Sequence, residues 1–119
     1  MNLADELKKI VSSVDGAMGA VLMGFDGIVV SDYKSDQAVE PLMEVAVEYS
    51  RLIKETIKVA QGNDLGELKE LVVSTAKYRM IFRLVNMEYF LGLFLADTAN
   101  VGKGRFILIR ASPLITEIL

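Results

Sequence analysis

One uninterrupted stretch, Gln37 to Gln61, limits the folds open to this chain, because it runs to Gly62 without a turn signal. When its residues are placed about 100° apart, as in an α-helix, the apolar side chains gather on one side. That side is filled by Leu42, Val45, Ala46, Tyr49, Leu52, Ile53, Thr56, Ile57, Val59 and Ala60. Their arc is roughly 200° wide, about twice what a helix lying on one sheet needs. We therefore expect a second surface, another copy of the same helix, to cover the remainder.

Composition narrows the possible functions. A length of 119 residues predicts one domain, 1–119, and 52% apolar with 24% charged residues is typical of a globular protein. A net charge of −3 with scattered basic residues argues against nucleic-acid binding. The chain has no cysteine and no histidine, which removes disulfides, thiolate metal sites and every Ser-His or Cys-His nucleophile. We expect no catalytic residue, no cofactor and no metal site.

Nothing in the sequence indicates export or membrane insertion. Asp5, Glu6, Lys8 and Lys9 place charges where a secretory signal would be apolar. The longest apolar run, 89–96, is far shorter than the roughly 20 residues of a membrane span. A cytoplasmic location is expected.

The first third of the chain predicts a helix and then a hairpin. Apolar residues recur at helical spacing from Leu3 to Val14, with Asn2 as N-cap. Strands at 17–23 and 28–33 flank the turn 24–27, whose Asp26-Gly27 pair favours a tight reversal. Ser35 and Asp36 are expected to cap the long helix, with Pro41 in its first turn.

The remaining chain predicts three strands and a helix. The strands are expected at 68–76, 78–85 and 88–96, and the last of them is apolar on both faces, as a central strand is. The tail 101–119 is ambiguous: Phe106 to Ile109 suits a strand, but a helical period favours a helix, which Pro113 either kinks or divides after a Ser112 cap. We choose helix.

The order α-β-β-α-β-β-β-α predicts a three-layer α/β domain. Its five-stranded antiparallel sheet carries the long helix alone on one face and the terminal helices on the other.

This order resembles the roadblock/dynein light-chain family across nearly the whole chain. The resemblance is clearest at Gly24-Phe25-Asp26-Gly27-Ile28, at Leu71-Val72-Val73-Ser74 and at Asn100-Val101-Gly102-Lys103-Gly104-Arg105. Within the family, the chain looks most like the bacterial gliding-polarity branch, MglB-like and MglC-like, and it leans towards MglC-like members.

The resemblance implies a homodimer in which the long helices pair antiparallel and the third strands join into one sheet. It also implies Ras-like small GTPases, or a second, MglB-like roadblock protein, as partners in cell polarity and gliding motility. The sequence itself supports pairing through the third strand. The stretch from Leu71 to Ala76 carries no charge, and such a strand would invite aggregation if its edge were left unpaired. The expected dimer contacts are Val45, Ala46, Tyr49, Leu52, Ile53, Leu71, Val72, Val73, Ser74 and Thr75.

A partner surface is expected on the rim of the long helix where apolar gives way to polar side chains. Its residues are Met43, Val47, Ser50, Arg51, Lys54 and Lys58. Met and Arg are enriched at interfaces, and Val47 is apolar among charges. The competing interpretation is peripheral dimer packing beside a solvated charge stripe.

Other candidate residues have plainer interpretations. Asp26 is expected to serve the turn, and Asp32 and Asp36 lack the spacing of a calcium loop. The stretch 102–104 lacks the Walker spacing, although Lys103 and Arg105 are available to a partner.

Arg79 and Arg83 are expected to snorkel at the sheet margin or to pair with acids such as Glu70 and Glu88. An arginine finger would project from a loop, and these residues lie mid-strand.

Three function classes follow. The leading hypothesis is a non-enzymatic dimeric adaptor or scaffold that regulates a small GTPase, directly or through another roadblock protein. The alternative is a small-molecule sensor, which needs a concave site with convergent polar groups. A hydrolase remains possible only if carboxylates are the catalytic groups. The carboxylates lie along one stripe of the long helix, which indicates that they are solvated surface charges instead.

Overall fold

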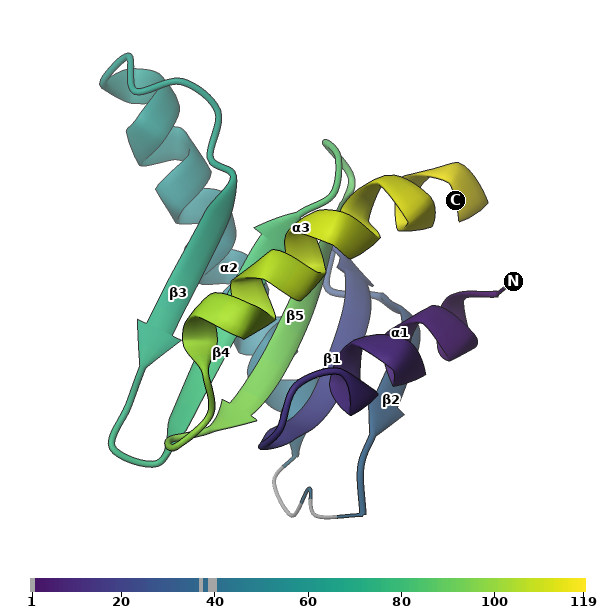
Figure 1. Ribbon diagram of the computed structural model, residues 1–119. Helices are drawn as coiled ribbons and strands as arrows, with labels where there is room; N and C mark the ends of the chain where they lie inside the picture. The colour runs from purple at the N-terminus through teal and green to yellow at the C-terminus, as the bar shows by residue number, and fades with distance from the viewer. Residues whose placement is uncertain (1, 37, 39–40) are drawn as a thin grey trace.

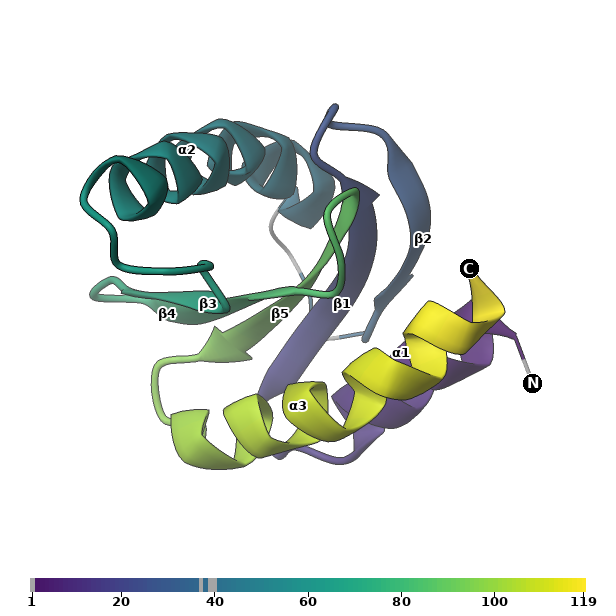
Figure 2. The same ribbon diagram turned by 90° about the horizontal axis from the view of Figure 1, so that it is seen from above.

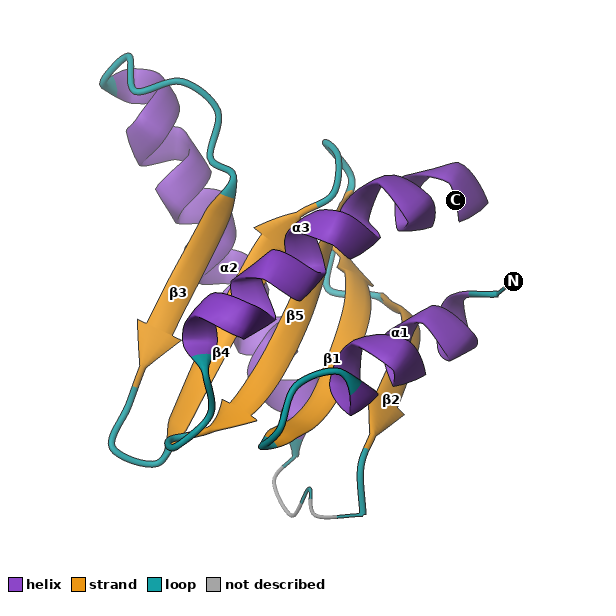
Figure 3. Cartoon of the chain, viewed as in Figure 1, coloured by secondary structure: helices purple, strands orange, loops and turns teal. Residues whose placement is uncertain are grey.

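The computed structural model describes residues 2–36, 38 and 41–119. The expected order of helices and strands is confirmed (Figure 1). The elements are α1 (Leu3–Ser12), β1 (Ala17–Gly24), β2 (Val29–Lys34), α2 (Leu42–Gly62), β3 (Glu70–Ser74), β4 (Tyr78–Leu84), β5 (Tyr89–Ala96) and α3 (Val101–Ile118). The five strands form one antiparallel sheet in the order β2-β1-β5-β4-β3 (Figure 3).

The sheet separates two hydrophobic cores. Figure 2 shows α2 on one face and α1 with α3 on the other, as expected. Residues such as Leu7, Leu93 and Leu108 fill the core beneath α1 and α3. The rings of Phe82 and Phe90 belong to the other core, beneath α2. The central place of β5 follows from its sequence, because its residues are buried on both faces except at the two ends.

The cap expected at the first helix and the turn expected in the first hairpin are both present. The Asn2 side chain accepts a hydrogen bond from the Asp5 N–H at 2.9 Å, which confirms the cap. In the β1–β2 turn, Asp26 Oδ1 accepts from the Ile28 N–H at 3.0 Å, and Gly27 has φ +86°. A positive φ favours glycine, so the Asp-Gly pair has the expected turn role.

The start of the long helix differs from the prediction. Ser35, Asp36 and Ala38 lie outside the helix, and α2 begins at Leu42 with Pro41 at the N-cap position and no side-chain cap; Gln37 lies outside the described residues. Pro41 has ψ 73°, which is not helical, and its carbonyl accepts the first helical bond from the Val45 N–H at 3.2 Å. Proline thus precedes the first turn instead of lying inside it.

The tail forms one helix, as chosen, and it continues through Pro113. Asn100 caps it by accepting from the Lys103 N–H at 3.0 Å, whereas the Ser112 hydroxyl donates to the Leu108 carbonyl at 2.8 Å. Pro113 lies on the exposed side of α3, where water can hydrate the carbonyl that loses its donor. None of the helices in the described part of the chain combines the length and apolarity that a bilayer crossing needs.

Candidate interaction surface

The long helix leaves apolar side chains exposed although it packs on a sheet. Its buried positions, Leu42, Ala46, Ser50, Ile53 and Ala60, define the side that faces the sheet. Outside that side, Val47 is 36% exposed, Leu52 47% and Val59 58%. The apolar arc predicted from the sequence is therefore wider than the chain's own sheet can cover.

The exposed residues fall on two flanks of the buried side. At 100° per residue, Val45, Leu52 and Val59 lie on one flank, which we call the apolar flank. The opposite flank, which we call the basic flank, consists of Met43, Val47, Lys54 and Lys58. Arg51 lies beyond the basic flank on the side facing away from the sheet. An apolar stripe and a mixed basic stripe therefore run along opposite sides of one helix.

Neighbouring contacts show which way each flank faces. The Tyr49 ring, beside the apolar flank, packs on the Phe82 ring of β4 with 5.1 Å between ring centroids. On the other side, a Cβ placed on Gly27 would lie 3.7 Å from Val47 Cγ1, so Val47 lies beside the β1–β2 turn. The apolar flank therefore faces the β4–β3 end of the sheet, and the basic flank faces the β1–β2 hairpin.

The apolar flank lies on the same side of the fold as an open sheet edge. β3 is the last strand of the sheet and pairs only with β4 among the described strands. Leu71 and Val73 point to the α2 face, where they join its core. Val72, on the opposite face, is 40% exposed. The apolar flank of α2 and the edge of β3 therefore lie on the same side of the fold, and we call the two together the apolar strip.

The structure sorts the predicted dimer and partner residues into exposed and buried groups. Ala46, Ile53 and Ser50 are buried against the chain's own sheet, and the Ser50 hydroxyl donates to the Val47 carbonyl at 2.6 Å. Thr75 lies in the β3–β4 turn, where its hydroxyl accepts from the Tyr78 N–H at 3.1 Å. The side chains of Ala46, Ser50 and Ile53 are therefore covered within one chain, whereas Thr75 is exposed.

An ion-pair network ties the open edge to α3. Arg105 of α3 donates from both Nε, at 2.7 Å, and Nη2 to Oε1 of Glu70, the first residue of β3. Arg83 of β4, directly opposite Glu70, places Nη1 3.9 Å from Glu70 Oε2. The hydrogen bond to Glu70, and then its charge, raise the pKa of Arg105 above its ordinary value. The stabilisation that comes with this raised pKa is lost only when Arg105 deprotonates in strongly alkaline solution. Arg105 therefore gives the free energy of unfolding no pH dependence near neutrality.

A Glu70→Gln variant is expected to lower the free energy of unfolding by about 1–3 kcal/mol. The reason is that Arg83, whose side chain is only 20% exposed, then loses its carboxylate partner. Urea unfolding followed by circular dichroism measures the change. Glu67→Gln, at an exposed position in the preceding loop, is the matched control and should change stability by less than about 0.5 kcal/mol. Equal stability of both variants would show that the network contributes nothing.

The sequence prediction covered only part of this network. Pairing of Arg83 with Glu70 was expected and is present. Arg79 instead donates to the backbone carbonyls of Thr75 and Tyr78. The Arg105–Glu70 bond was missed, because the two residues are 35 positions apart and no local periodicity connects them.

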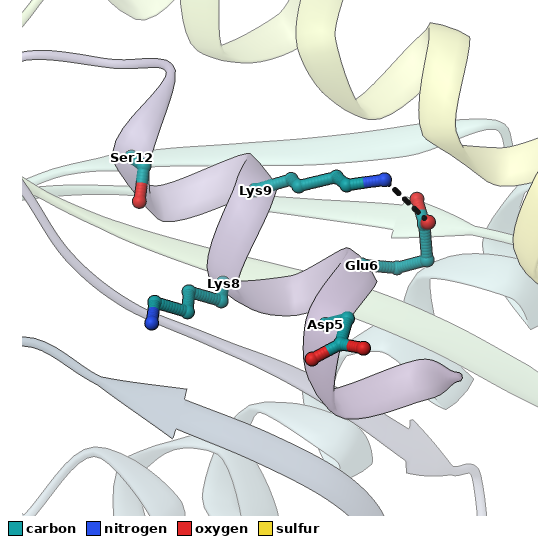
Figure 4. A pocket seen from close by; sticks show the side chains of 5 residues that line it. All are labelled: Asp5, Glu6, Lys8, Lys9 and Ser12. Atoms are coloured by element: carbon teal, nitrogen blue, oxygen red, sulfur yellow. Dashed lines mark hydrogen bonds and ion pairs between the residues drawn. The ribbon is translucent and has the colours of Figure 1, made fainter. Parts of the chain in front are cut away.

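Two hollows bear on ligand binding. One, of about 520 Å³, is lined by Asp5, Glu6, Lys8, Lys9 and Ser12, all from α1 (Figure 4). In Figure 4 the Glu6 and Lys9 side chains meet in an ion pair of 3.3 Å, which satisfies the buried Glu6 carboxylate. Because a single helix supplies every lining residue, polar groups do not converge there from several elements.

The second hollow, of about 320 Å³, lies between the end of α2 and the β3–β4 region, with Phe25, Ile57, Leu68 and Leu84 in its wall. Its size is at the low end for a small-molecule site. Among the described residues, no group of three or more acidic side chains is placed to hold a metal ion. The second hollow, formed by described residues, is thus an observation that favours a ligand-binding role.

A five-stranded antiparallel sheet with one long helix on one face and two terminal helices on the other defines a roadblock-type domain. No protein-family model and no curated protein matches the sequence. Solved structures do match. The crystal structure of MglC from Myxococcus xanthus is 34% identical over 97% of both chains, with a TM-score of 0.70.

Two further structures share the fold at lower identity. The Roadblock/LC7 domain from Streptomyces avermitilis is 17% identical, covers 98% of this chain and 97% of its own, and has a TM-score of 0.86. The gliding protein MglB from Thermus thermophilus is 22% identical over 96% of this chain and 85% of its own, with a TM-score of 0.85. The chain therefore belongs to the roadblock/LC7 family, as a member similar to MglC and MglB.

Proposed function

We propose that this protein is a non-enzymatic dimeric adaptor that regulates a Ras-like small GTPase system of the cell-polarity or gliding-motility type. The observation that carries the proposal is the exposed apolar strip of α2 and β3 in a chain 34% identical to MglC. A second copy is the proposed cover for the apolar flank, and the basic flank is the proposed docking surface for the GTPase or for an MglB-like protein. The solved structures of MglB include a tetrameric arrangement, which supports assembly between roadblock chains.

The mechanism is surface presentation. Two antiparallel α2 helices form a twofold platform whose outer sides carry Met43, Val47, Arg51, Lys54 and Lys58 from each copy. A partner that binds this platform more tightly in one conformation is shifted towards that conformation. No chemical step by this chain is needed.

A Val47→Arg variant is expected to weaken partner binding at least tenfold, because a charge then occupies the apolar centre of the basic flank. Calorimetric titration of the dimer into a GTP-loaded small GTPase from the same genome, with and without an MglB-like protein, measures the effect. Val59→Arg, on the apolar flank, is the comparison and should disrupt the dimer instead. If the unchanged dimer binds neither protein, the adaptor role is wrong.

The second candidate function is a small-molecule sensor, which the hollow beside Ile57 and Leu84 favours. A thermal-shift screen of metabolites distinguishes the two functions. A compound that stabilises the protein, and no longer does so after Leu84→Trp fills the hollow, would support the sensor. No stabilising compound is expected.

A further inference from the structure

The last helix, α3, exposes apolar side chains away from the sheet. Its buried positions, which face the sheet, are Gly104, Leu108, Ala111 and Ile115. Outside that side, Phe106 is 54% exposed, Ile109 44% and Leu114 42%. We call the outward side the outer patch, and it consists of Lys103, Phe106, Ile109, Arg110, Leu114 and Glu117. The described part of the chain therefore leaves an apolar surface of α3 uncovered.

The outer patch is basic although the protein is acidic. α3 contains three basic residues and one acidic residue, a net charge of +2, in a chain of net charge −3. Of its three cations, Arg105 is paired with Glu70, whereas Lys103 and Arg110 form no ion pair with any described residue. The guanidinium carbon of Arg110 lies over the Phe106 ring, 5.6 Å from its centroid. Two unpaired cations beside an exposed ring favour a partner that is both acidic and apolar.

A second copy of α3 fits this patch poorly. In a twofold antiparallel packing about the middle of the patch, Arg110 would face the same residue of the second copy at the buried centre, where like charges are costly. Lys103 would meet Glu117 in such a pairing, but these contacts lie at the exposed ends and contribute little. Self-association through α3 is therefore disfavoured.

A membrane surface fits the patch poorly too. Anionic lipids would extend over the whole face of the molecule that α1 and α3 form. On that face α1 presents the exposed Asp5, and the loop before α3 presents the exposed Asp97. The positive charge is confined to one helix, so its width suits a single segment of another protein.

The spacing of the charges favours a helix as that segment. Lys103, Arg110 and Glu117 follow one another at intervals of seven residues, or about 10.5 Å along the axis. A second helix that crosses α3 at about 20° meets the same line at the same interval. Two acidic residues a heptad apart would then face the two cations, and a basic residue one heptad further would face Glu117. Apolar residues between them would contact Phe106.

We propose that the outer patch of α3 binds an acidic amphipathic helix of a different protein. The inference goes beyond the proposed adaptor function, because it adds a second interaction surface. α2 and α3 lie on opposite faces of the sheet, so the basic flank of α2 stays accessible while the outer patch is occupied (Figure 2). One dimer can therefore hold a partner on each face.

Two synthetic helices of about 20 residues test the proposal on the unchanged dimer. Both carry the same apolar stripe. The acidic peptide has Glu, Glu and Lys at heptad spacing, and the swapped peptide has Lys, Lys and Glu at the same positions. Titration followed by nuclear magnetic resonance gives the affinity and the location of binding. The acidic peptide should bind at least about tenfold more tightly, with the largest amide shifts between Lys103 and Glu117.

Arg110→Glu is expected to reverse the preference between the two peptides. The acidic peptide should bind the variant at least about tenfold more weakly, because a carboxylate then faces its own, and the swapped peptide should bind more tightly. Lys34→Glu is the matched control, since it makes the same change of charge at an exposed position of β2, the far edge of the sheet. The control should bind both peptides as the unchanged protein does.

Four results would overturn the proposal. Equal affinity of the unchanged dimer for the two peptides would show that the charges of α3 are not read, and amide shifts confined to α2 would place the site elsewhere. Sedimentation with phosphatidylglycerol vesicles that Arg110→Glu abolishes would make the patch a membrane surface. A tetramer in light scattering that the same variant reduces to a dimer would make a second copy the occupant. The adaptor proposal is unaffected by all four, because it is tested by Val47→Arg and the small GTPase.

Discussion

A Leu52→Glu variant is expected to be a monomer at concentrations where the unchanged chain is a dimer. Leu52 is at the middle of α2 on the apolar flank and is 47% exposed in the single chain. A carboxylate there would be buried without a partner in the dimer, at a cost of about 3–5 kcal/mol, while it remains hydrated in the monomer. The dissociation constant should rise by roughly two to four powers of ten. Analytical ultracentrifugation over a concentration series measures it.

Val47→Glu is the matched control, because it introduces the same charge at a position of comparable exposure on the opposite flank. This variant should remain a dimer. Circular dichroism spectra of both variants should match that of the unchanged protein, since neither side chain belongs to a core. A Leu52→Glu protein that dimerises normally would show that the apolar flank is not a dimer contact.

A Phe82→Ala variant is expected to lose about 3–5 kcal/mol of its free energy of unfolding. Phe82 is fully buried in β4, and its ring packs against Tyr49 at 5.1 Å, Phe90 at 6.0 Å and Phe94 at 6.1 Å between centroids. Removing it leaves a cavity beneath α2 and deprives Tyr49 of its support. Urea unfolding at a fixed protein concentration measures the loss, because dimerisation makes apparent stability depend on concentration.

Met87→Ala is the control for this experiment, since Met87 is 96% exposed in the β4–β5 turn and should change stability by less than about 0.5 kcal/mol. A loss below about 1 kcal/mol for Phe82→Ala would mean that the core beneath α2 can repack around the missing ring.

The order of the elements could be predicted because strong local signals decide it. The helical period of α2, the Asp26-Gly27 turn and the apolar faces of β5 each act within a few residues. The start of α2 was missed, because Ser35 and Asp36 look like caps and Pro41 suits both the first turn and the position before it. Only the backbone angle of Pro41 separates these two cases.

The interaction surface was predicted as dimer contacts on the long helix and third strand and a partner rim on the helix, but the division of the helix into two flanks of the side buried on its sheet was not. Periodicity shows that α2 has too many apolar residues, and it cannot show which of them its own sheet covers. Ser50 looked like a rim residue and is buried, whereas Leu52 looked like its neighbours and is half exposed. That division depends on how α2 crosses the sheet, which Tyr49, Phe82 and Gly27 determine through contacts distant in sequence.

The mass of the unchanged protein in solution tests the central claim most directly. Light scattering across a dilution series from high to low micromolar concentration should give twice 13.1 kDa, with α2 protected from hydrogen exchange along Val45, Leu52 and Val59. A stable, well-behaved chain of 13.1 kDa throughout the series would contradict it. The exposed strip of α2 and β3 would then have no second copy to cover it.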